Sequence, residues 1–156
     1  MIREAGVLDI TPIIDFLRPY HGESMFGKRG RVIDEDRLLE TIGGAVLQDE
    51  WIVLVSLDDI GVNGVILAQT GYTFYQDLEM DIDLFYVSPD ARGTGVSRML
   101  VEEIINVAKN KKIGIIYCGC HSNMSDGGKN NKLYTNLFKK YGFEVTGTNL
   151  HLHIGD

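Results

Sequence analysis

The sequence predicts a single α/β domain, built on a mixed, mostly antiparallel twisted sheet that is flanked by helices. Strand-like apolar runs alternate along the chain with amphipathic segments of helical spacing, which is the pattern of such a domain. Between residues 82 and 118 a strand, a glycine-bearing turn, a helix and a second strand follow one another, which predicts a parallel strand pair with a right-handed crossover. The 156 residues, 44% of them hydrophobic, suit one core, so we assign residues 1–156 to one domain.

The first third of the chain predicts a short strand and two helices. Residues 2–5 form the strand, and a helix that Pro19 ends follows it. The glycine-rich and charged stretch 20–31 predicts a loop. Asp34 caps the second helix and Gly43-Gly44 stops it. Its expected inward side chains are Leu38, Leu39 and Ile42.

The rest of the chain predicts a hairpin, a third strand and a strand between two helices. The expected strands are 51–55, 62–70, 78–87 and 113–118, with closing strands at 143–145 and 150–154. The expected helices are 94–110 and 126–141, and Gly142 ends the second. The inward face of helix 94–110 holds Val96, Met99, Leu100, Ile104 and Val107.

Charge and hydropathy argue against several classes of protein. The formal net charge of −7 disfavours a nucleic-acid partner, because binding to phosphates needs many lysines and arginines, and it suits cationic substrates. The chain has no apolar run of the ~20 residues that a membrane helix needs. Residues 1–5 lack the apolar stretch of a signal peptide. We therefore expect a cytoplasmic protein without membrane or nucleic-acid partners.

The two cysteines, Cys118 and Cys120, do not predict a disulfide framework. With His121 they offer three metal-ligating side chains, but alternating strand positions do not close the tetrahedron that zinc requires. We therefore expect free thiols at the end of a buried strand, and no metal.

The segment 88–97, Ser-Pro-Asp-Ala-Arg-Gly-Thr-Gly-Val-Ser, follows an apolar strand and begins a long helix. Amide groups at a helix N-terminus have no partners within the helix, and the helix dipole adds positive potential there. Gly93 and Gly95 let the backbone approach a ligand closely, and Arg92 adds a cation suited to phosphate oxygens. This segment therefore predicts a binding site for a ligand that carries a diphosphate.

These motifs and the order of the elements resemble the GNAT family of N-acetyltransferases over nearly the whole chain. The family's acyl-CoA loop, Gln/Arg-x-x-Gly-x-Gly/Ala, is similar to residues 92–97, with Ser97 at the last position. A later family segment is similar at Asn131 and at Gly142-Phe143, but Phe138 stands where the family has a tyrosine. A Rossmann fold is a weaker interpretation without a full Gly-x-Gly-x-x-Gly, and no Gly-Lys-Ser/Thr of a Walker loop is present.

The resemblance implies a sheet splayed at the parallel strand pair, with the pantetheine arm of acetyl-CoA in the opening. The backbone of Phe85 and Val87 would pair with that arm, the amides from Gly93 to Arg98 would hold the diphosphate, and Asn131 would help to place the thioester. The implied coenzyme-binding residues are Phe85, Tyr86, Val87, Arg92, Gly93, Thr94, Gly95, Val96, Ser97, Arg98 and Asn131.

Acyl transfer to an amine needs a base that keeps the amine neutral and a proton source for the leaving thiolate. Glu79, Asp81 and Asp83 alternate along strand 78–87, so they should share one face, and Phe85 and Val87 should continue it toward the coenzyme. Crowded carboxylates raise one another's pKa, which suits a base. We expect Asp81 or Asp83 to act as the base, with Asp81 slightly favoured.

The proton source is less evident from the sequence. Phe138 cannot donate a proton, so we consider Tyr134, one helical turn earlier and on nearly the same face, as the general acid. Water or another side chain is the alternative. His21, Glu23 and Ser24 lie in the predicted loop between the first two helices, which by the resemblance lines the acceptor site.

The implied reaction is the transfer of an acetyl group from acetyl-CoA to the primary amine of a small cationic molecule. The resemblance implies direct attack in a ternary complex, without a covalent cysteine intermediate. Two alternatives stay open, namely a protein amine as the acceptor and a non-catalytic acyl-CoA-binding module, which Phe138 motivates. A transferase that acts on charged tRNA is disfavoured by the net charge of −7. A homodimer is compatible with the resemblance.

Overall fold

The computed structural model describes residues 1–119, 129–147, 152 and 154, and at residues 25, 26 and 129–131 it describes the backbone alone. Its centre is a five-stranded sheet in the order β1-β2-β3-β4-β5. The strands are β1 (Ile2–Glu4), β2 (Trp51–Leu57), β3 (Val62–Gly71), β4 (Leu78–Val87) and β5 (Ile113–Cys118). The first four strands pair antiparallel and β5 pairs parallel to β4. The predicted fold class is confirmed, and β4 and β5 have the predicted bounds.

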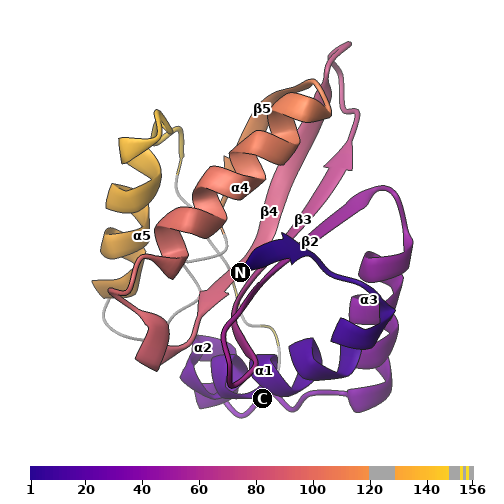
Figure 1. The fold of residues 1–156 in the computed structure, drawn as a ribbon, viewed down its shortest axis with the longest axis vertical. Helices are drawn as coiled ribbons and strands as arrows, with labels where there is room; N and C mark the ends of the chain where they lie inside the picture. Colours follow the sequence, from indigo (N-terminus) through magenta and orange to yellow (C-terminus); the bar gives the residue numbers. More distant parts are fainter. Residues whose placement is uncertain (120–128, 148–151, 153, 155–156) are drawn as a thin grey trace.

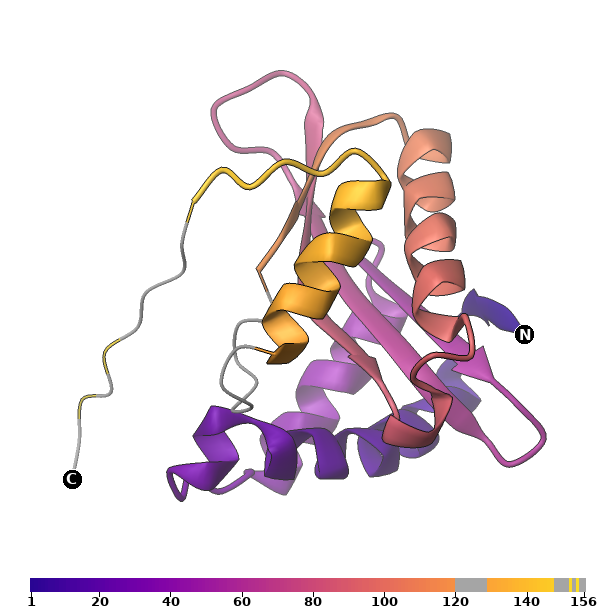
Figure 2. The same ribbon diagram turned by 90° about the vertical axis from the view of Figure 1, so that its left-hand side faces the viewer.

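Helices cover both faces of the sheet (Figure 1). On one face lie α4 (Val96–Asn110) and α5 (Lys129–Lys140), side by side in the turned view (Figure 2). On the other face lie α1 (Ile10–Glu23) and α3 (Glu35–Leu47), and the short α2 (Met25–Lys28) follows α1. Two 3-10 turns, η1 (Val7–Asp9) and η2 (Pro89–Ala91), precede α1 and α4. In the described part of the chain, no helix is long and apolar enough to cross a membrane.

Each face of the sheet carries its own hydrophobic core, because alternate residues of a strand point to opposite faces. Leu54 and Ile66 belong to the core under α4 and α5, together with Leu100 and Ile104 of α4. The neighbouring strand positions face α1 and α3, and that second core includes Ile13, Leu17 and Ile42 from the helices and Val53, Val55, Val65 and Leu67 from the strands. Burial on both faces explains why β2 and β3 are nearly continuous apolar runs.

The sheet opens between its last two strands. Pairing of β4 with β5 runs from Leu78 and Ile113 to Ile82 and Cys118, and β4 then continues to Val87 without a β5 partner. The remaining edge of β4, residues 83–87, leads directly into the turn before α4. The splayed parallel pair that the resemblance implies is therefore present in the molecule.

Several predicted element ends are wrong. The helix α1 runs through Pro19 to Glu23, because proline withholds only one backbone N–H and the buried Leu17 keeps this segment packed. The helix α3 begins after Asp34, whose side chain caps it as predicted, but it passes Gly43-Gly44 and ends at Leu47. The burial of Ile42 and Ala45 on either side offsets the ~1 kcal/mol that a glycine costs in a helix.

A few side chains and the C-terminal strands also depart from the prediction. Leu39 and Met99, expected to point inward, are 53% and 44% exposed, while Val101 and Ala108 of α4 are buried instead. Residues 143–145 are not a strand. Residues 126–128 of the expected last helix and most of the expected strand 150–154 lie outside the described residues, and so does Cys120-His121. Gly142 follows α5 with a φ of 89°, as expected for a glycine that ends a helix.

Candidate functional site

The turn between β4 and α4 forms an open cradle of backbone amides. Gly93 and Gly95 have φ angles of 82° and 98°, a conformation that glycine adopts without strain. Gly95 is the N-cap of α4, so the amides of Val96, Ser97 and Arg98 have no acceptor within the helix. In the described part of the chain no acceptor lies within hydrogen-bond range of the Gly93 or Gly95 amide either.

The geometry of this turn fits a diphosphate. A Cβ added at Gly93 would have no protein atom within 4 Å, so this side of the turn is open to a ligand. The Thr94 hydroxyl donates to the carbonyl of Ala91 at 2.6 Å, which holds the turn in shape. Donors without partners at a helix N-terminus, next to left-handed glycines, are a common anion site in proteins. The turn therefore has the geometry of an anion site, and the binding of a diphosphate there stays a prediction.

The Arg92 side chain does not lie over this turn as a separate cation. Its Nε donates to the carbonyl of Val87 at 3.0 Å and its Nη2 donates to Glu23 at 3.0 Å. Burial is the largest single influence on the pKa of Arg92 and lowers it, but the hydrogen bond to Glu23 and the charge of Glu23, together with smaller contributions from Tyr134 and Tyr86, raise the pKa overall. Arg92 therefore occupies one hydrogen-bonding position of the Val87 carbonyl, and the pairing of Phe85 and Val87 with a pantetheine arm stays a prediction.

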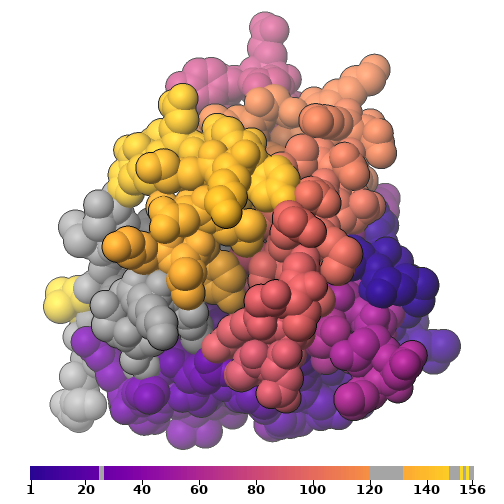
Figure 3. Space-filling model, turned by 60° about the vertical axis from the view of Figure 1, so that its left-hand side comes forward, coloured from indigo at the N-terminus to yellow at the C-terminus, as the bar shows by residue number. Residues whose placement is uncertain are grey.

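Aromatic side chains line the open edge of β4 on the side of α5. The Phe85 ring packs against Tyr134, with ring centroids 5.0 Å apart, and against Phe138 at 5.5 Å. Phe138 also packs on Phe143 at 5.0 Å and is buried, so the residue at the family's tyrosine position is part of the core. Figure 3 shows the surface over α4 and α5, which lie next to each other above α1 and α2.

Tyr134 lies on α5 and packs on Phe85 of β4. Its side chain is buried, and its electrostatic interaction contributes to the raised pKa values of both Tyr86 and Arg92. Asn131 also lies on α5, but its side chain is outside the described residues.

A β-bulge interrupts β4 at Asp83. The consecutive β3 residues Leu67 and Ala68 pair with Leu84 and Ile82 of β4, so the β4 residue between them has no partner on β3. Asp83 is therefore the extra residue of the bulge, and the strand bends there. The bulge lies directly after the last residue of β4 that pairs with β5, so Asp83 marks the beginning of the open edge.

The bulge changes which side chains share a face. Asp81 pairs with Gln69 and Tyr86 pairs with Val65, and these β3 partners are an even number of positions apart. Asp81 and Tyr86 therefore share a face of the sheet, which is the face toward α1. Phe85 and Val87 instead belong to the core under α4 and α5. The prediction that Phe85 and Val87 continue the face of the carboxylates is therefore wrong, because a regular alternation of residues does not survive an inserted one.

The three carboxylates of β4 have different surroundings. Glu79 is buried and accepts a hydrogen bond from the Thr73 hydroxyl at 3.0 Å. Asp81 and Asp83 stay exposed at their tips, yet the protein around them removes enough solvent to raise the pKa of each. The negative charge of Asp81 raises the pKa of Asp83 further. The predicted rise in pKa is present, but burial rather than crowding is its main cause, and the role of either aspartate as a base stays a prediction.

Glu23 is the residue of this site whose position the sequence did not reveal. It ends α1, where its two carboxylate oxygens accept hydrogen bonds from the Tyr86 hydroxyl at 2.6 Å and from Arg92. The rings of Phe16 and Tyr20 pack on Tyr86 with centroids 5.1 and 5.0 Å away. The spacing of residues 16, 20 and 23 on one helical face was the available signal, but the expected helix end at Pro19 concealed it.

Other candidates from the loop prediction have structural roles. The His21 ring nitrogen Nε2 contacts the carbonyl of Arg31 at 2.8 Å. Ser24 is buried, donates to the carbonyl of His21 at 2.8 Å and accepts from the Gly27 amide at 3.2 Å. These contacts shape the connection from α1 to α2. In the described part of the chain, no group of three or more His, Cys, Asp or Glu residues could hold a metal ion.

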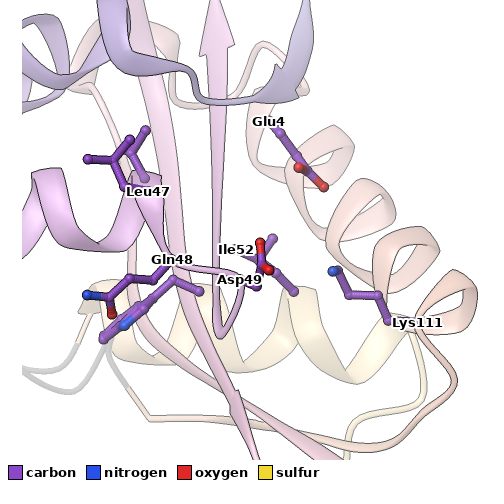
Figure 4. A pocket seen from close by; sticks show the side chains of 8 residues that line it. Glu4, Leu47, Gln48, Asp49, Ile52 and Lys111 are labelled. Carbon is purple, nitrogen blue, oxygen red and sulfur yellow. The ribbon is translucent and has the colours of Figure 1, made fainter.

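A separate hollow of about 120 Å³ lies near the β1 edge of the sheet (Figure 4). The end of α3, the start of β2 and Lys111 line it, with Glu4, Gln48 and Asp49 among its side chains. Pockets for organic ligands usually measure ~300–1,000 Å³, so it is too small for a coenzyme. None of its lining residues belongs to β4 or to the glycine turn.

Comparisons with known proteins agree with this fold. A transcriptional regulator from Bacillus halodurans C-125 superimposes with a TM-score of 0.75 at 18% identity, over 99% of both chains. A protein described as a probable acetyltransferase gives 0.76 at 14% identity, over 100% of this chain and 99% of its own. An aminoglycoside acetyltransferase from an uncultured soil metagenomic sample, in complex with sisomicin, gives 0.75 at 13%, over 99% and 96%. At such identities these likenesses show the fold alone.

This fold is the fold of a family of acyltransferases that use an acyl-CoA as their co-substrate. A family model described as an acetyltransferase (GNAT) domain matches residues 42–145, which is two thirds of the chain. The chain belongs to the GNAT acetyltransferase family. A search of curated proteins finds no match to it.

Proposed function

We propose that this protein transfers an acetyl group from acetyl-CoA to the primary amine of a small cationic molecule, by direct attack in a ternary complex. The observation that carries the proposal is the juxtaposition of three features at one end of β4. These are the open edge at residues 83–87, the amide cradle at Gly93 and Gly95, and the carboxylates Asp81 and Asp83 with raised pKa values.

The coenzyme-binding residues are proposed from this geometry. The amides of Gly93, Gly95 and the first turn of α4 would hold the diphosphate, and the backbone of β4 around Phe85 would hold the pantetheine arm. When bound, acetyl-CoA supplies an activated acyl thioester. The left-handed glycines keep this cradle preorganised, so the turn needs no rearrangement to accept an anion.

Asp83 is the proposed base. It is the first residue of β4 beyond the β5 pairing, so its carboxylate lies where the sheet opens, whereas Asp81 lies one position before the pairing ends. We therefore propose Asp83 rather than Asp81 as the base, and the charge of Asp81 raises the pKa of Asp83. A carboxylate with a raised pKa accepts the proton of an ammonium more readily near neutral pH than an ordinary one.

Tyr134 is the proposed proton donor to the leaving thiolate. Its ring packs on Phe85 beside the open edge, and Phe138 offers no hydroxyl. A small cationic acceptor is supported by the net charge of −7 and by the exposed carboxylates next to the opening. The aminoglycoside acetyltransferase that shares this fold binds sisomicin, a ligand of this chemical class.

The first experiment is a calorimetric titration with acetyl-CoA of the wild type, Gly95→Trp and Gly142→Trp. Both glycines have left-handed φ angles, 98° and 89°, so the two variants carry a comparable backbone strain. We expect Gly95→Trp to lose binding and Gly142→Trp to keep it, because only the first obstructs the amide cradle. A wild type that does not bind acetyl-CoA would remove the basis of the proposal.

The second experiment is an amine screen that detects released thiol, with saturating acetyl-CoA. Aminoglycosides, polyamines and peptides with a free N-terminus represent the small cationic and the protein acceptors. Turnover of small cationic amines is the expected result. Binding of acetyl-CoA without turnover of any amine would favour the second candidate, a non-catalytic acyl-CoA-binding module, for which the buried Phe138 is the supporting observation.

A further inference from the structure

An ion pair links the helix α1 to the glycine turn. The Nη2 atom of Arg92 donates to Oε2 of Glu23 at 3.0 Å, although the two residues lie 69 positions apart. The other carboxylate oxygen of Glu23 accepts from the Tyr86 hydroxyl at 2.6 Å. The side chains of Arg92 and Glu23 are 30% and 31% exposed, so both charges are partly removed from solvent and interact more strongly than surface charges.

The positive member of this pair lies next to the amide cradle. Arg92 directly precedes Gly93, and its backbone N–H already closes the turn onto Ser88 and Pro89. Its guanidinium carbon is 5.6 Å from the centre of the Tyr86 ring. A diphosphate bound at the cradle would therefore attract Arg92, while the adjacent negative charge of Glu23 opposes that attraction.

The negative member of the pair lies on the α1 face of the sheet, which also carries Asp81. Glu23 contacts Tyr86, and Tyr86 shares the α1 face of the sheet with Asp81. A positively charged acceptor that approaches these carboxylates from the α1 face would be attracted to Glu23, and the positive charge of Arg92 opposes that attraction. A single ion pair therefore joins the regions in which the two substrates bind.

We propose that the Glu23–Arg92 ion pair couples the binding of the two substrates, and that Glu23 is a positioning residue for the positive charge of the acceptor. The inference rests on the proposed function. The diphosphate of the coenzyme and the ammonium of the acceptor each compete for one member of the same pair. The free-energy cost of separating Glu23 from Arg92 arises only once, when the first substrate binds. The second substrate therefore binds more tightly than it would to the free protein, and the increase in affinity is the same for either order of binding.

A purely structural ion pair predicts the opposite effect of removing Glu23. If Glu23 only braces the turn through Arg92, its loss loosens the cradle and weakens coenzyme binding. If Glu23 instead holds Arg92 away from the diphosphate, removing Glu23 lets Arg92 interact with the diphosphate and strengthens coenzyme binding. The sign of the change in affinity therefore decides between the two roles.

The test is a calorimetric titration with CoA of the wild type, Glu23→Gln, Arg92→Gln and the double variant. We expect Glu23→Gln to bind CoA about fivefold more tightly, which corresponds to about 1 kcal/mol. The double variant should bind no more tightly than Arg92→Gln, because the gain acts through the arginine. Glu35→Gln is the matched control, since it removes the same charge from an exposed pair with Arg18, and it should change the affinity less than twofold.

Unchanged or weaker CoA binding by a folded Glu23→Gln variant, with normal binding by the wild type, would overturn the coupling while leaving the proposed function intact. A wild type that does not bind CoA would instead remove the proposed function, and this inference with it. The two failures are therefore distinguishable.

A second measurement needs only the wild type, so it holds even if Glu23→Gln does not fold. Spermidine serves as the cationic probe and is titrated into the protein with and without saturating CoA. A blank titration of spermidine into CoA corrects for their direct association. We expect spermidine to bind at least about threefold more tightly in the presence of CoA. Equal affinity in both titrations, or no binding in either, would overturn the coupling.

Discussion

Two glycines with the same left-handed backbone conformation separate binding from stability in this protein. Gly93 and Gly142 have φ angles of 82° and 89°, and at both positions an added Cβ would meet no atom within 4 Å. Alanine at either position therefore introduces the left-handed strain of an L-residue without a steric clash. The two variants differ only in location, one in the amide cradle before α4 and the other after α5.

The expected cost to stability is the same at both positions. A left-handed L-residue costs about 1–2 kcal/mol, and the reduced entropy of the unfolded chain returns about 0.4–1 kcal/mol. We therefore expect a net loss of about 1 kcal/mol in the free energy of unfolding. For a chain of this size, that corresponds to a Tm lower by about 2–4 °C in Gly93→Ala and in Gly142→Ala.

The expected effect on coenzyme binding differs. A methyl group at Gly93 would lie on the open side of the turn, where the diphosphate is proposed to bind, so we expect acetyl-CoA affinity to fall at least about tenfold, or 1.4 kcal/mol. Gly142→Ala should bind acetyl-CoA like the wild type. Calorimetric titration and thermal unfolding of the same samples measure both quantities. If Gly93→Ala kept the affinity of Gly142→Ala, the cradle would not be the binding site.

Three further predictions concern the chemistry and the core. Asp81→Asn should move the acidic limb of the pH–rate profile to lower pH. The Asp81 charge raises the pKa of Asp83, so without it Asp83 loses its proton at a lower pH. A loss of activity without such a shift would identify Asp81 as the base. Tyr134→Phe should lower kcat by about 10²-fold or more with little change in acetyl-CoA affinity, and an unchanged kcat in steady-state assays would exclude Tyr134 as the proton donor. Phe138→Ala should cost about 3–5 kcal/mol in chemical denaturation because Phe138 is buried against Phe85, whereas Leu39→Ala at an exposed position should cost far less.

Much of the architecture could be predicted from local patterns. The bounds of β4 and β5, the cap at Asp34 and the glycine turn at 93–95 are all confirmed. Each depends on a few neighbouring residues, such as a run of apolar side chains or a short side chain that accepts from the next turn of a helix. Such features are visible in the sequence because their physical cause lies within a few positions of the chain.

The face assignments of β4 could not be predicted in this way. The alternation of Asp81 and Asp83 is visible in the sequence, but burial by the surrounding protein is the main cause of their raised pKa values, and the bulge at Asp83 separates Asp81 from the face of Phe85. A bulge is an offset in pairing between two strands, so it depends on how β3 and β4 meet rather than on either strand alone.

The sequence by itself determined the α/β class, the parallel strand pair and the glycine turn before α4, because periodicity, glycine conformation and helix ends are local properties. The tertiary structure alone decided that Arg92 pairs with Glu23 across 69 residues and that α1 continues past Pro19 to carry Glu23 there. Ion pairs and helix ends of this kind depend on packing between segments that are distant in the chain, and the packing energy of α1 on the sheet exceeds the local preference of a proline.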